Sequence, residues 1–168
     1  MSAPTGARRH LVSLLVENRA GVLARIAGLF SRRGFNIFSL AVAPTEDERF
    51  SRVSIVVDLE SATLDQVLAQ LDKLVNVVAI NELRPEDAHE AELLLATVAG
   101  DTEARAALVD ASTRFGGRVL EVGEETLTVQ LAGPPAVLDE FEALARTLRI
   151  VGLQRTGTIG LPKLGAPR

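Results

Sequence analysis

Cysteine, tryptophan and tyrosine are absent from the 168-residue chain, and only two histidines are present. Without cysteine the chain can form no disulfide, zinc–thiolate site or thiol nucleophile, which suits a reducing compartment, so we expect the cytoplasm. No apolar run approaches the roughly 18 residues of a membrane helix, and the short polar N-terminus has the pattern of neither a signal nor a transit peptide. These absences predict a soluble protein with no membrane partner.

Clustered positive charge is also missing. The net charge is −4 and is spread without long runs, whereas a nucleic-acid surface needs grouped Lys and Arg side chains to displace counterions from phosphates. Sheets that bind RNA stack bases on aromatic side chains, yet aromatic residues make up 4% of the chain and are all Phe. We therefore expect no nucleic-acid partner.

Catalytic and metal-binding motifs are equally scarce. His10 and His89 lack the H-E-x-x-H or His-x-His spacing of metal sites and are predicted to be surface side chains at element boundaries. The chain has neither a G-x-x-x-x-G-K-[ST] phosphate loop nor a G-x-G-x-x-G fingerprint. An acylphosphatase-like enzyme is the strongest catalytic rival, but the Arg-bearing anion loop and water-orienting Asn that it needs are not evident. The pattern favours a protein that binds a small molecule, with no metal site.

What the chain does have is a repeated order of strand and helix patterns. A strand–helix–strand–strand–helix–strand order spans residues 10–84, and the same order returns over residues 91–160. Residues 85–90, polar and with a proline, are predicted to form a linker. Right-handed crossovers give each unit a four-stranded antiparallel sheet with two helices on one face. The expected fold class is α+β with two tandem ferredoxin-like units, and flexible ends at residues 1–9 and 161–168.

Two features of these elements bear on partners and boundaries. The last strand is predicted to run over residues 150–159, and the first helix from Gly21 to Arg33. The strand at residues 10–16 carries apolar residues toward both sheet faces, although helices cover only one. A monomer would expose the second face or an open strand edge, so we expect self-association or a larger partner.

The turn from Glu17 to Gly21 lacks a Ser, Thr or Asp just before Gly21 to cap the first backbone amides of the helix. A carboxylate ligand could accept from the amides near Gly21, Val22 and Leu23 at the positive end of the helix dipole, because Gly21 permits close approach. The Asn18 side chain could bond the ligand's amino or carboxylate group. An ordinary turn with water on the amides explains the same residues, and local sequence alone favours it.

A second asparagine, Asn36, starts the second strand. In the 4-1-3-2 strand order of this fold the second strand lies at a sheet edge, where two subunits could pair. Such pairing would place Asn36 and Ile37 near the Asn18 turn of a neighbour. A turn asparagine before a strand remains the alternative explanation.

Short motifs follow one another in a specific order through both units. They are Leu15-Val16-Glu17-Asn18, Gly21-Val22-Leu23, Gly28-Leu29-Phe30, Arg33-Gly34-Phe35-Asn36-Ile37, Lys73-Leu74-Val75 and Thr128-Val129-Gln130-Leu131-Ala132-Gly133. In this order the sequence resembles the small regulatory subunits of acetohydroxyacid synthase, also called acetolactate synthase, which carry an N-terminal ACT domain. The resemblance spans most of the chain.

The resemblance implies a binding site shared between two subunits. ACT domains of this family pair into a dimer and bind a branched-chain amino acid, typically valine, at the interface. The residues that match the family's ligand turn and partner-strand contacts are Asn18, Gly21, Val22, Leu23, Asn36 and Ile37. The first unit is therefore expected to bind the amino acid and to form a homodimer or a higher oligomer.

The same resemblance implies a regulatory role in branched-chain amino-acid biosynthesis and no catalysis by this chain. Small subunits of the family activate a separate catalytic large subunit and transmit feedback inhibition to it. Thiamine diphosphate, magnesium and FAD are then expected on the large subunit and no cofactor on this chain. The alternative is a stand-alone ACT-type sensor that acts on another enzyme or on a transcription factor.

Overall fold

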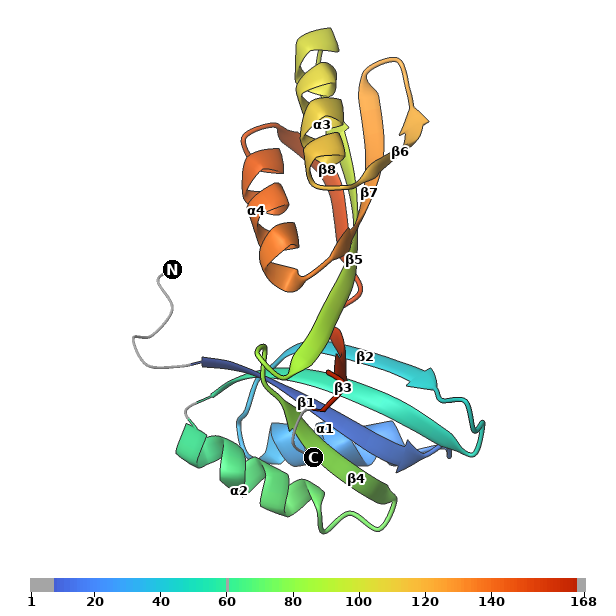
Figure 1. Ribbon diagram of the computed structural model, residues 1–168, viewed down its shortest axis with the longest axis vertical. Coiled ribbons are helices and arrows are strands. Elements are labelled where there is room, and N and C mark those ends of the chain that lie inside the picture. Colours follow the sequence, from blue (N-terminus) through green and yellow to red (C-terminus); the bar gives the residue numbers. More distant parts are fainter. Residues whose placement is uncertain (1–7, 60, 166–168) are drawn as a thin grey trace. The chain divides into compact units, whose positions relative to one another are not determined.

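The computed structural model describes residues 8–59 and 61–165, which divide into two units (Figure 1). The first unit contains the chain up to His89 together with the segment from Thr158 onward, and the second contains Glu90–Gly157. No helix in these described residues is long and apolar enough to cross a membrane. Parts of the predicted flexible ends, residues 1–7 and 166–168, lie outside the described residues.

The first unit is one antiparallel sheet with two helices packed on it (Figure 1). Its elements are β1 (Arg8–Glu17), α1 (Val22–Arg32), β2 (Ile37–Pro44), β3 (Phe50–Leu59), α2 (Ser61–Leu71), β4 (Val77–Leu83) and the short β9 (Ile159–Pro162). The sheet order β2-β3-β1-β4 is the predicted one and places β2 at an edge.

Alternation along the strands and helical spacing in α1 build the core of this unit. Val12, Leu14 and Val16 of β1 point to the helix side and are at most 2% exposed. They meet Ile26 and Phe30 of α1, which lie four residues apart on one helix face. His10 continues the same row, is 7% exposed and bonds Glu82 through Nδ1 at 3.0 Å. Its predicted surface position was therefore wrong, because β1 begins two residues before His10 and carries it inside.

The second unit repeats the architecture. Its elements are β5 (Ala88–Ala99), α3 (Thr102–Arg114), β6 (Arg118–Val122), β7 (Thr126–Gly133), α4 (Pro135–Ala145) and β8 (Arg149–Arg155). The strands are antiparallel in the order β6-β7-β5-β8. Both helices pack on one face, around Leu108, Leu138 and Phe141. The predicted fold class, two tandem ferredoxin-like units, is confirmed.

The C-terminal segment differs from the sequence prediction. The strand expected over residues 150–159 ends at Arg155, and Gly157 takes a φ of 85°, so the chain turns before β9. β9 pairs with β5, whose first residues, Ala88 and His89, belong to the first unit. Part of the expected linker and part of the expected flexible tail are thus strands. The apolar pattern of a short strand does not indicate which strand it pairs with, so the sequence could not predict the position of β9.

Candidate functional site

The turn at the end of β1 leaves the start of α1 open. Gly21 is the N-cap residue, with a φ of 83°, in the left-handed region that favours glycine, and no side chain caps the helix. The Val22 N–H reaches the Arg19 carbonyl oxygen at 3.4 Å. Within the described part of the chain, the N–H groups of Leu23 and Ala24 have no acceptor. These donors, at the positive end of the helix dipole, are suited to an anionic group.

Asn18 is held in this turn by two hydrogen bonds. Its backbone N–H donates to the Arg49 carbonyl at 2.8 Å, and its Nδ2 donates to the Glu48 carbonyl at 2.9 Å. Both acceptors lie in the connection between β2 and β3. The Oδ1 atom of Asn18 has no partner among the described residues and is available as an acceptor for an ammonium group.

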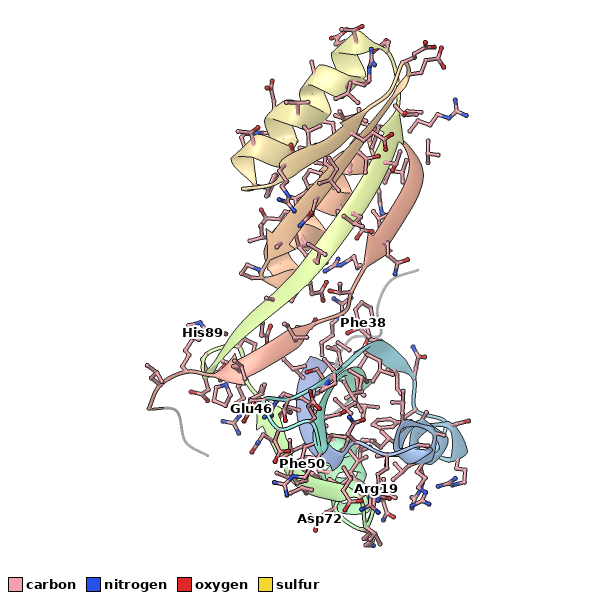
Figure 2. The ribbon with its side chains drawn as sticks, turned by 90° about the vertical axis from the view of Figure 1, so that its right-hand side faces the viewer. Arg19, Phe38, Glu46, Phe50, Asp72 and His89 are labelled. Atoms are coloured by element: carbon pink, nitrogen blue, oxygen red, sulfur yellow. The ribbon has the colours of Figure 1, made fainter. Side chains whose placement is uncertain are left out.

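Asn36 and Ile37 lie at the other end of the same unit. Glu17, next to the turn, pairs with Phe50 of β3, whereas Ile37 pairs with Val57. At a rise of roughly 3.3 Å per residue, these two pairs lie about 23 Å apart along the sheet. Figure 2 shows Arg19 of the turn and Phe38, the neighbour of Ile37, at opposite ends of the first unit. One chain alone does not bring Asn36 and Ile37 to the turn.

The second unit offers an internal comparison. Its first helix, α3, also follows a strand, but Asp101 Oδ1 accepts from the Ala104 N–H at 2.9 Å and caps it. A side-chain carboxylate there occupies the position that is open at α1. Of these two equivalent helix starts, the one at Asp101 has a side-chain cap and the one at Gly21 has none.

Two other features are separate from this turn. A pocket of about 330 Å³, lined in part by His10, Asp65 and Arg84, includes none of the predicted site residues. Across the residues for which positions are described, no group of three or more His, Cys, Asp or Glu side chains is placed to hold a metal ion.

Known proteins similar to this chain share most of its length. The acetolactate synthase small subunit of Mycolicibacterium smegmatis is 41% identical over 156 residues, which are 93% of this chain and 90% of that protein. A probable acetolactate synthase small subunit of Archaeoglobus fulgidus is 38% identical over 91% of this chain and 96% of its own. This chain belongs to the acetolactate synthase small subunit family.

Further comparisons assign both halves of this small subunit. Residues 12–79 match the family described as the AHAS small subunit-like ACT domain, and residues 91–164 match the small subunit of acetolactate synthase. The crystal structure of the Thermotoga maritima acetolactate synthase small subunit superposes with a TM-score of 0.84 at 33% identity, covering 93% of this chain and 98% of that one. The resemblance inferred from the motifs is confirmed, and a small subunit implies a catalytic large-subunit partner.

Sequence reasoning missed the residues that hold the turn of this small subunit in place. These are Glu48 and Arg49, through their carbonyl groups, and Asn76, which bonds Glu17 and Arg25 on either side of the turn. Every residue has a backbone carbonyl, so the sequence does not mark Glu48 and Arg49 as hydrogen-bond acceptors. Asn76 follows a helix in a short connection, where asparagine is common for conformational reasons alone.

Proposed function

We propose that this chain activates the catalytic large subunit of acetolactate synthase and confers feedback inhibition on it by a branched-chain amino acid, typically valine, without catalysis of its own. The observation that carries the proposal is the uncapped start of α1 beside Asn18, in a member of this small-subunit family. The contrast with the capped α3 supports an open ligand position in the first unit.

In the proposed site, the amino-acid carboxylate accepts from the first-turn amides above Gly21, from Leu23 and from Val22, whose N–H also reaches the Arg19 carbonyl at 3.4 Å. The ammonium group donates to Asn18 Oδ1. A second copy, paired along its β2 edge, brings Asn36 and Ile37 to the aliphatic part of the ligand. The edge position of β2 and the separation of Ile37 from Asn18 within one chain both support a shared site.

The proposed regulation follows from that sharing. An amino acid held by two copies stabilises one arrangement of the ACT pair, and the large subunit senses it through contacts that differ between arrangements. Such coupling commonly amounts to ~1 to 3 kcal/mol. We place thiamine diphosphate, magnesium and FAD on the large subunit, none of them on this chain, and both subunits in the cytoplasm.

The test is an acetolactate synthase assay of the large subunit with and without this chain, across valine, leucine and isoleucine. We expect the chain to raise activity, one of the amino acids to lower it again, and the two subunits to co-purify. A chain that binds an amino acid but neither binds nor activates the large subunit would instead be a stand-alone sensor. Turnover by the isolated chain would contradict the proposal of a purely regulatory role.

A further inference from the structure

β1 and β4 change register where β1 reaches the turn. Leu15 pairs with Ala79, but the next residue, Val16, pairs with Val77, so one residue of β4 is left over in a bulge. Bulges redirect the chain near functional sites. Here the bulge brings Asn76, the residue before β4, beside Glu17, whose N–H donates to the Asn76 carbonyl at 2.9 Å.

Both ends of the Asn76 side-chain amide are used. Nδ2 donates to Glu17 Oε2 at 2.6 Å, and Oδ1 accepts from Arg25 Nη1 at 2.7 Å. Each bond involves a charged partner, which makes it stronger than a bond between neutral groups. Asn76 thus links the last residue of β1 to the first turn of α1.

The turn lies between these two partners. Glu17 precedes it, and Arg25 follows it and donates its own N–H to the Gly21 carbonyl at 3.1 Å. Fixing Glu17 and Arg25 to one amide limits how far the turn can open and where the amides of Leu23 and Ala24 point. A site ordered before its ligand arrives loses less entropy on binding.

We infer that Asn76 is a positioning residue for the effector turn, acting through Glu17 and Arg25 without touching the ligand. The inference rests on the proposed function of that turn. It assigns a role in effector affinity to the connection between α2 and β4, which carries none of the predicted ligand contacts. Asp72, labelled in Figure 2, marks the start of this connection, at the same end of the unit as Arg19 of the turn.

Isothermal titration of the full-length chain with valine tests the inference. Asn76→Ala removes both side-chain bonds and should weaken binding by about tenfold or more. The double substitution Glu17→Gln with Asn76→Asp reverses the donor and acceptor, keeps the net charge and leaves a carboxylate for Arg25. We expect it to restore most of the lost affinity. Asn76→Asp alone sets two carboxylates together and should bind poorly.

A stability control separates positioning from general loosening. Asp101→Ala removes the α3 cap and should lower the melting temperature without changing valine affinity. If wild type bound no branched-chain amino acid, the proposed function itself would be wrong. Equal valine affinity of wild type and Asn76→Ala would overturn only the inference, as would a folded double variant that fails to recover binding. Should Asn76→Ala not fold, Asn76→Asp and the double variant decide.

Discussion

The side chain of Asn18 is bonded to the backbone of Glu48, with 2.9 Å between Nδ2 and the carbonyl oxygen. The turn that opens α1 is therefore tied to the connection between β2 and β3. β2 is the edge strand at which we propose a second copy to pair. A change at the effector turn has a direct route, through Asn18 and this connection, to the strand of the proposed interface.

Gly21→Asp should abolish or strongly weaken valine sensitivity while the chain still activates the large subunit. The substitution adds strain at a φ of 83° and places a carboxylate where the ligand carboxylate is proposed. Two carboxylates a few ångströms apart repel by roughly 1 to 4 kcal/mol, so the half-inhibitory valine concentration should rise at least about fivefold. Inhibition curves of the reconstituted enzyme measure this.

Gly116→Asp is the matched control for that variant. Gly116 has a φ of 72° and, like Gly21, has no atom within 4 Å of an added Cβ, but it follows α3 in the second unit. It should cost similar stability and leave valine sensitivity unchanged. Wild-type sensitivity of the Gly21→Asp enzyme would show that the effector lies elsewhere.

Subunit complementation should reveal the shared site. Asn18→Ala and Asn36→Ala should each lose valine binding, but an exchanged mixture should regain part of it, because half of the dimers are then mixed and every mixed dimer contains one site with neither substitution. For random exchange between equal amounts, about a quarter of the wild-type sites should return. Calorimetric stoichiometry before and after exchange gives the number. No recovery after confirmed exchange would place both residues in the same subunit's site.

Gly160→Val should destabilise the first unit. A Cβ at Gly160 would lie 2.7 Å from Leu11 Cδ2 and 2.9 Å from Leu83 Cδ1, and both leucines are buried. Overpacking of this kind typically costs about 1 to 3 kcal/mol, measurable by urea unfolding. Gly152→Val, where an added Cβ meets nothing within 4 Å, is the control. Equal unfolding midpoints for both variants would argue against packing of β9 on the sheet face that carries Leu11 and Leu83.

Glu90→Gln should stabilise the chain at neutral pH. Burial, together with the nearby charge of Glu92, raises the pKa of the Glu90 carboxyl above its ordinary value. The folded state therefore disfavours the charged form, and wild type loses stability as pH rises through that raised pKa, whereas glutamine does not titrate. The advantage of the variant should disappear as pH falls below the ordinary carboxyl range. Unfolding curves across pH test this, with exposed Glu140→Gln as control.

Several parts of this protein followed from sequence alone. The Leu/Val-rich run of β1, the alternating apolar residues of β3 and the helical spacing of Val22, Ile26, Leu29 and Phe30 determined these strands and α1, since such patterns reflect which faces are buried. The order of elements determined two ferredoxin-like units with β2 at an edge. The ordered motifs determined the family, and the missing cap before Gly21 marked the open helix start.

Other parts were decided only by the tertiary structure, because they depend on residues distant in sequence and on carbonyl groups that every residue carries. The bulge beside Val16 brought Asn76 to Glu17. Asn18 donates hydrogen bonds to backbone carbonyl groups in the connection between β2 and β3. The turn at Gly157 returned the C-terminal segment to the first unit. Strand register also placed Ile37 at the far end of the sheet from the turn, because α1 lies between them in the sequence and runs along the length of the sheet.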